Sequence, residues 1–282
     1  MYIDTHTKET IQKSVCEIFN IKVRELEELF IKATQESHTE TFTDGDKLDN
    51  VLNEFIDDRM SDKNIDQILF FHLGRRLNSV GERVEGKNLL ELLSDENEMS
   101  MFLKNHEVKF KERDGHLDLY YKDELISLED KNKYNVPYLR LRLGYNSNRI
   151  DYCYNGFVFR DLIFKNSYAR SLYSAPEFLG SLAEFLSHPS MKKDYFDNSK
   201  YYCFEYLVPI DKIYFDANEK LNKLDKQKYL LNQVLHRLYE YSIRESRFMF
   251  DHDNTIIRLS DYDVMQEEYF VSKEEITMEM LG

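Results

Sequence analysis

A short acidic motif near the C-terminus combines residue types that can do chemistry. Residues 266 to 271 read Gln-Glu-Glu-Tyr-Phe-Val, and the apolar end of this run predicts a short strand over residues 267 to 271. Such a strand would hold the Glu268 carboxylate at the edge of a cleft, with the Gln266 amide directed into the same space. A carboxylate beside a nucleotide ribose can stabilise the positive charge that develops at the anomeric carbon during glycosyl transfer. The alternative is that these residues are solvent-facing polar groups in an acidic chain.

A second set of polar residues follows a stretch rich in apolar side chains. Residues 65 to 73 predict a buried strand that ends in Gly74, Arg75 and Arg76. Because side chains alternate along a strand, His72 and Arg76 share one side and Arg75 lies on the other. The glycine between them would let a ligand approach, Arg76 could bind a phosphate, and His72 could bind a sugar hydroxyl. The alternative is that His72 is a satisfied core histidine and both arginines end the strand in solvent.

Taken together, the two segments resemble the layout of NAD-dependent mono-ADP-ribosyltransferases. In that family a histidine or arginine on the first central strand is followed far downstream by Gln or Glu, any residue, a Glu and an apolar strand. The resemblance implies that Glu268 is the catalytic carboxylate, that Gln266 orients the target, and that His72 or Arg76 contacts NAD. It also implies an acceptor other than arginine, because the residue at 266 is Gln. Arg75, beside Arg76, is a further candidate for the NAD contact.

The resemblance covers residues 63 to 282 in order and spacing, and two short motifs carry it. Many members have a Ser-Thr-Ser strand that supports the NAD pocket, and no such triplet occurs in this sequence. The nearest candidates are residues 171 to 174 and the pair Tyr168 and Tyr173. In the subgroup that uses His, Tyr and Glu, a tyrosine stacks on nicotinamide, so we expect one of these two to do so. The resemblance does not account for the N-terminal helices.

Charge and composition restrict the classes of function. The formal charge is −14, from 38 basic and 52 acidic residues, which argues against a general nucleic-acid binder. The acidity either keeps the protein soluble or offers an acidic surface to a basic protein partner, including by mimicry of nucleic acid. Cys16, Cys153 and Cys203 are widely spaced and lack metal-ligand spacing, so we expect reduced thiols and a cytoplasmic location. No apolar run approaches the roughly 20 residues of a membrane-spanning helix.

Two functions therefore compete. The first is NAD-dependent ADP-ribosyl transfer to a protein or nucleic-acid acceptor, as in a bacterial or phage toxin or counter-defence factor. The second is a non-catalytic acidic protein that binds and inhibits a partner protein, as a phage anti-defence or immunity protein would. The enzyme requires Glu268 within about 10 Å of His72 or Arg76 across an open groove. A hollow filled with packed side chains favours the binding protein.

The order of elements predicts an α+β fold with a split antiparallel sheet, because strands and helices follow one another without regular βαβ alternation. We expect a helical extension over residues 1–62 and an α+β domain over 63–282. Helices are predicted over residues 7–34, 47–60, 88–104, 136–143, 158–173, 176–185 and 225–249. Strands are predicted over residues 65–73, 107–110, 117–121, 124–128, 201–209, 212–215, 255–258 and 267–271.

Overall fold

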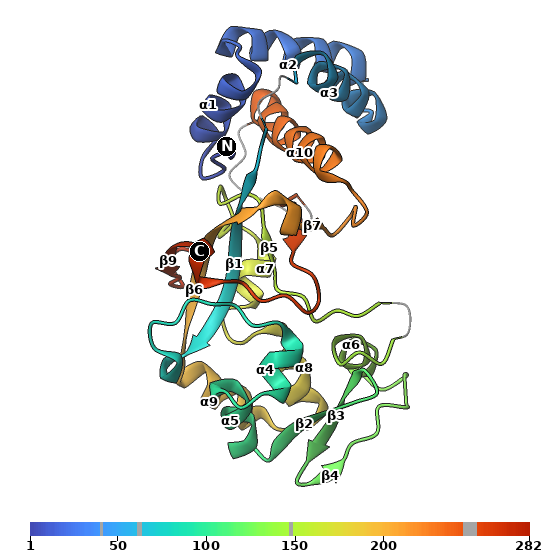
Figure 1. Ribbon diagram of the computed structural model, residues 1–282, viewed down its shortest axis with the longest axis vertical. Helices are drawn as coiled ribbons and strands as arrows, with labels where there is room; N and C mark the ends of the chain where they lie inside the picture. Colours follow the sequence, from blue (N-terminus) through green and yellow to red (C-terminus); the bar gives the residue numbers. More distant parts are fainter. Residues whose placement is uncertain (40–41, 61–63, 147–148, 245–252) are drawn as a thin grey trace. The chain divides into compact units, whose positions relative to one another are not determined.

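The computed structural model describes residues 1–39, 42–60, 64–146, 149–244 and 253–282. Its helices and its two antiparallel sheets confirm the predicted α+β class (Figure 1). The helices are α1 (Lys8–Phe19), α2 (Val23–Ser37), α3 (Gly45–Arg59), α4 (Leu89–Ser94), α5 (Glu98–Asn105), α6 (Val136–Arg142), α7 (Ser167–Ser171), α8 (Glu177–Phe185), α9 (Pro189–Asp197) and α10 (Lys223–Ile243). The strands are β1 (Gln67–Leu77), β2 (Val108–Arg113), β3 (His116–Tyr121), β4 (Glu124–Leu125), β5 (Asn155–Phe157), β6 (Ser199–Pro209), β7 (Tyr214–Phe215), β8 (Ile256–Arg258) and β9 (Phe270–Glu275).

The chain divides into two compact units, each assembled from three separate segments. Unit 1 comprises Met1–Phe71, Phe157–Lys165 and Leu207–Ile257, and unit 2 comprises His72–Gly156, Asn166–Tyr206 and Arg258–Gly282. The predicted boundary at residue 62 coincides with neither unit, because α1, α2 and α3 pack with the much later helix α10 inside unit 1 (Figure 1). Packing partners that are distant in the sequence therefore define the units.

Helix α1 of unit 1 begins and ends at residues with clear capping chemistry. The Thr7 side chain accepts a hydrogen bond from the Thr10 backbone N–H at the start of α1, and Asn20 ends that helix in the left-handed region with φ of 53°. The predicted helical run over residues 7–34 is therefore two helices. Helix α10 is the longest described helix, and the predicted continuation over 245–249 lies outside the described residues.

The larger sheet has the strand order β7-β8-β5-β1-β6-β9. Its strand β1 confirms the predicted strand and continues through Gly74, Arg75 and Arg76 to Leu77. Strand β6 pairs with β9 in antiparallel register, from Tyr202 opposite Glu275 to Tyr206 opposite Phe270. The strand that follows the acidic motif is therefore separated from β1 by β6.

Several further predicted elements differ from the structure: the helix predicted over residues 88–104 is two helices, α4 and α5, and the strand predicted over 124–128 ends at Leu125. In the predicted helix over residues 158–173, only α7 is helical, because the Val158 and Phe159 backbone N–H groups bind Thr255 and Asn254 instead of making helical bonds. In the predicted strand over residues 267–271, Glu267–Tyr269 form a single 3-10 turn and β9 begins only at Phe270.

The smaller sheet confirms the predicted meander, and a buried carboxylate links it to the chain that follows. Strands β2 and β3 pair antiparallel, with β4 beside β3. Asp118 on β3 is 2% exposed and accepts hydrogen bonds from Arg113 Nε at 2.9 Å, His116 Nε2 at 3.1 Å and the Tyr145 hydroxyl at 2.9 Å. This carboxylate therefore holds three separate donors at once.

We expect Asp118→Asn to lower the free energy of unfolding by about 2 kcal/mol, because a buried amide would face donors that need an acceptor. The matched control is Asp123→Asn on the same sheet, where the carboxylate pairs with Lys109 but is 81% exposed. That control should leave the free energy of unfolding nearly unchanged. Urea unfolding followed by circular dichroism measures both, and equal losses would contradict the role given to Asp118.

Candidate functional site

The two arginines of β1 lie on opposite faces of the sheet, as the alternation predicted. The Arg75 guanidinium lies 4.6 Å from the centre of the Phe196 ring, and the Arg76 guanidinium lies 5.0 Å from the centre of the Phe204 ring. Every contact described in this subsection lies within unit 2. The two faces differ in chemistry. The residues that the sequence predicted as NAD contacts are divided between them.

Arg75 is a structural residue whose donors are engaged by the protein. Its Nε donates to Ser199 Oγ at 2.9 Å, and its Nη2 donates to the carbonyl oxygens of Phe196 at 3.1 Å and Ser199 at 2.6 Å. Its Nη1 donates to the Tyr173 carbonyl. The side chain is 8% exposed and fastens the end of α9 and the start of β6 to β1. These bonds leave it little capacity to bind a nucleotide.

The predicted NAD contacts therefore do not form one cluster. Tyr173 lies against the Arg75 guanidinium at 5.8 Å, and Tyr168 lies near Tyr201, which also neighbours Arg75. His72 and Arg76 are on the other face of β1. The alternation had already separated Arg75 from Arg76, but nothing in the sequence showed which face the two tyrosines would join.

His72 is held as a neutral imidazole with one nitrogen left as an acceptor. Its Nδ1 lies 2.7 Å from the Asn155 carbonyl oxygen, which can only accept, so Nδ1 carries the proton. The ring stacks on Tyr154 with centroids 4.1 Å apart. Burial, and then the charge of Arg76, lowers the pKa of His72 to about 3. Its Nε2 lies over Gly74, where a Cβ atom would come within 2.5 Å of it, so only glycine leaves this nitrogen its place.

Arg76 is the less completely bonded of the two arginines. Its Nη2 donates to the Tyr154 hydroxyl at 3.3 Å and to the Glu85 carbonyl at 3.4 Å, both long for hydrogen bonds. Its Nε is buried without a partner, and no carboxylate among the described residues forms an ion pair with it. Burial acts to lower the pKa of Arg76, but the oxygens of Tyr154 and Tyr206 raise it above its ordinary value, so the group stays charged.

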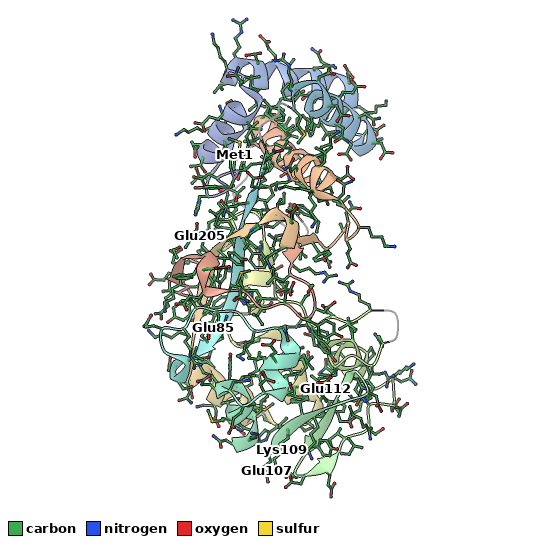
Figure 2. The ribbon with its side chains drawn as sticks, viewed as in Figure 1. Met1, Glu85, Glu107, Lys109, Glu112 and Glu205 are labelled. Carbon is green, nitrogen blue, oxygen red and sulfur yellow. The ribbon has the colours of Figure 1, made fainter. Side chains whose placement is uncertain are left out.

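A short segment, residues 84–86, covers this arginine, and we call it the strap. The Tyr206 hydroxyl donates to the Val84 carbonyl at 2.5 Å, and the Glu85 carbonyl accepts from Arg76 (Figure 2 labels Glu85 near β1). A Cβ atom on Gly86 would lie 2.4 Å from the Tyr154 ring, so the strap backbone is in close contact with that ring. The space beside Arg76 is filled in this structure.

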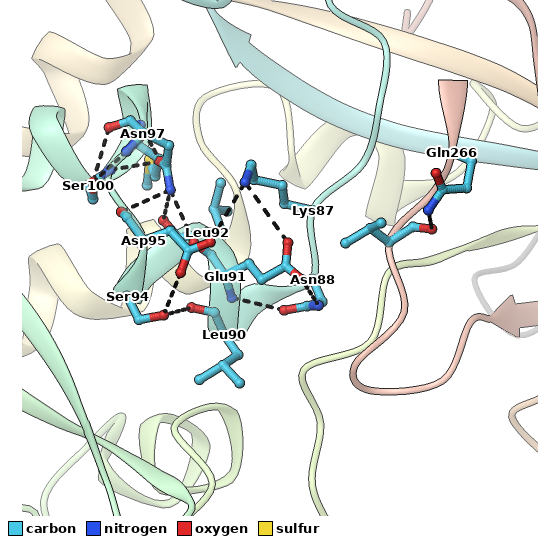
Figure 3. A network of polar contacts seen from close by, with 12 residues as sticks. Lys87, Asn88, Leu90, Glu91, Leu92, Ser94, Asp95, Asn97, Ser100 and Gln266 are labelled. Atoms are coloured by element: carbon cyan, nitrogen blue, oxygen red, sulfur yellow. Dashed lines mark hydrogen bonds and ion pairs between the residues drawn. The ribbon is translucent and has the colours of Figure 1, made fainter. Parts of the chain in front are cut away.

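The strap also joins this cluster to the acidic motif. Gly86 and Met265 exchange two backbone hydrogen bonds, of 3.0 and 2.7 Å, so the motif begins one residue after a contact with the strap. The motif itself is exposed. Gln266 Nε2 donates only to the Val264 carbonyl, at 3.5 Å. Gln266 takes no part in the hydrogen-bond network around Lys87 (Figure 3). Burial, and then a hydrogen bond with Glu268, raises the pKa of Tyr269.

Sequence reasoning missed the aromatic residues that surround His72 and Arg76. Tyr154 is 5% exposed, Phe204 1% and Tyr206 0%. Phe204 and Tyr206 alternate along β6, so a signal for a shared aromatic face was present in the sequence. Tyr154 precedes the Asn-Gly turn signal at 155–156, and no periodicity linked it to β1.

No protein-family model, curated protein or solved structure matches this chain. Among the described residues, no group of three or more His, Cys, Asp or Glu side chains is placed to hold a metal ion. In the same part of the chain, no helix has both the length and the apolar character needed to cross a membrane.

His72 makes stability depend on pH in a defined direction. Its pKa is about 3 in the folded protein and near 6.5 in the unfolded chain, so the unfolded chain binds more protons between these values. Stability should therefore be unaffected by His72 above pH 7 and fall as the pH drops below 6.5. Between pH 7.5 and 6.0 we expect the protein to lose about 1 kcal/mol more stability than the His72→Gln variant. Urea unfolding at both pH values tests this, and parallel losses in the two proteins would contradict a neutral His72 in the folded protein.

Proposed function

We propose that the protein transfers ADP-ribose from NAD to an acceptor, with His72 and Arg76 binding NAD and Glu268 acting at the ribose. The observation that carries this proposal is the backbone pairing of Gly86 with Met265. It joins the acidic motif to the strap, in which Glu85, the residue before Gly86, accepts a hydrogen bond from Arg76 through its carbonyl. The two motifs that suggested the activity are therefore linked through a single short segment.

The chemistry of the cluster fits a dinucleotide. A neutral imidazole with a bare Nε2 can accept a hydrogen bond from a ribose hydroxyl. A guanidinium with a spare donor can bind a phosphate oxygen more strongly than it binds the neutral carbonyl of Glu85. The Tyr154 and Phe204 rings beside it offer apolar surface. To bind NAD, Arg76 would have to exchange the Glu85 carbonyl for the ligand.

Glu268 would act on the bond that breaks. When the bond between the nicotinamide nitrogen and the ribose anomeric carbon breaks, its electron pair leaves with nicotinamide and the ribose becomes positively charged. The Glu268 carboxylate can stabilise this charge, and the acceptor then forms the new bond at the same carbon and loses its proton. Gln266, two residues earlier and also exposed, would orient the acceptor, which could be a protein or a nucleic acid.

A second candidate function has its own supporting observation. The strap and the aromatic rings fill the space beside Arg76, as expected of a cluster that only stabilises the fold. The protein would then be a non-catalytic acidic protein that binds and inhibits a partner, with its formal charge of −14 directed at a basic surface. The two candidates differ in whether the purified protein consumes NAD.

We expect Glu268→Gln to reduce nicotinamide release from NAD by at least about 100-fold, because the variant removes the charge that stabilises the transition state. Its midpoint of thermal unfolding should be nearly unchanged, because an exposed side chain contributes little to folding. The matched control is Glu267→Gln, the neighbouring exposed carboxylate, which should keep most of the activity. Unaltered turnover in Glu268→Gln, or no turnover in the unmodified protein with host lysate as acceptor, would refute the enzyme.

A further inference from the structure

Tyr154 contacts both side chains that the proposed function assigns to NAD. Its ring stacks on His72 at 4.1 Å with an interplanar angle of 27°, and its hydroxyl lies 3.3 Å from Arg76 Nη2 and 3.4 Å from the Tyr206 hydroxyl. The side chain is 5% exposed and lies under Gly86 of the strap. One buried residue thus sets the position of an imidazole and a guanidinium together.

The direction of each hydrogen bond in this group can be deduced. The Val84 carbonyl only accepts, so the single hydroxyl proton of Tyr206 is directed at Val84. The Tyr206 oxygen then accepts the proton of Tyr154, and it also lies in contact with Arg76. The Tyr154 oxygen in turn accepts from Arg76, which can only donate. The donated protons therefore run from Arg76 through Tyr154 and Tyr206 to Val84, and Arg76 also contacts Tyr206 directly.

The same elimination applies to the other side of the Tyr154 ring. His72 Nδ1–H donates to the Asn155 carbonyl, so the residue next to Tyr154 in the sequence fixes the tautomer while Tyr154 fixes the plane of the ring. The tautomer and the ring plane of His72 are therefore both set by two consecutive residues, 154 and 155. They direct His72 Nε2 over Gly74 and so along β1 toward Arg76.

We propose that Tyr154 is a positioning residue, which orients His72 by stacking and Arg76 through its hydroxyl so that both can bind one ligand. This inference rests on the proposed function and extends it to a residue that is not expected to touch the reacting atoms. The ring and the hydroxyl have separable tasks. Tyr154→Phe keeps the stack and removes the acceptor for Arg76, whereas Tyr154→Leu removes both.

The kinetic test compares Tyr154→Phe with Tyr195→Phe. Tyr195 is an equally buried tyrosine whose hydroxyl donates to the Arg75 backbone carbonyl at 3.1 Å and makes no hydrogen bond to the Arg76 side chain. We expect Tyr154→Phe to raise the KM for NAD about tenfold with kcat within about twofold, because Arg76 loses one of the oxygens that orient it while Glu268 is untouched. Tyr195→Phe should leave both constants unchanged even if it lowers the unfolding temperature by the same amount. An unchanged KM in Tyr154→Phe, or an equal rise in Tyr195→Phe, would overturn the proposal.

A second measurement needs no turnover and separates this proposal from the proposed function. Nitrogen-15 NMR of the histidine rings reports the tautomer and the titration of His72. We expect the unmodified protein and Tyr154→Phe to keep the Nδ1–H form down to pH 5.5, and Tyr154→Leu to shift the His72 titration upward toward 6.5. An unchanged His72 titration in Tyr154→Leu would overturn the positioning role. If the NMR result holds but NAD is not consumed, only the proposed function fails.

Discussion

Two adjacent cations on one strand are the constraint around which unit 2 is arranged. Arg75 is buried and Arg76 is partly buried, and each packs against an aromatic ring on its own face of the sheet. A buried guanidinium is costly unless hydrogen bonds replace the water it loses. On one face the end of α9 supplies carbonyl oxygens, where the negative end of the helix dipole also favours a cation. On the other face tyrosine oxygens, an aromatic ring and the strap do so.

The two arginines are not equally well hydrogen-bonded. Arg75 stabilises the fold, whereas Arg76 belongs to the proposed binding site. Arg75 makes hydrogen bonds from all three of its nitrogens, so any exchange of partners would lose stability. Arg76 makes long bonds to the neutral oxygens of Glu85 and Tyr154, also contacts the Tyr206 hydroxyl, and keeps one buried nitrogen without a partner. Under the proposed function, an anion would replace the Glu85 carbonyl as the partner of Arg76.

Sequence patterns predicted the parts of this arrangement that depend on local periodicity. Strand β1, the placement of His72 and Arg76 on one side, the meander and α10 follow from alternation or helical spacing, and the structure confirms them. The patterns failed where distant backbone decided the outcome, as for the segment around Phe159, whose N–H binds Asn254. They also could not show that Tyr173 would face Arg75, because no local signal connects α7 to a face of β1.

The adjacency of the two arginines also settles how β1 can be aligned with its neighbours. Moving the strand by one residue would turn every side chain to the opposite face. Arg75 would then meet the aromatic side, without the carbonyls at the end of α9, and Arg76 would face those carbonyls in place of the tyrosine oxygens. His72 would leave Tyr154, and an apolar residue would take the space over Gly74. A shift of the pairing register would therefore cost free energy through the buried charges as well as through lost apolar burial. Both costs favour the observed register of β1.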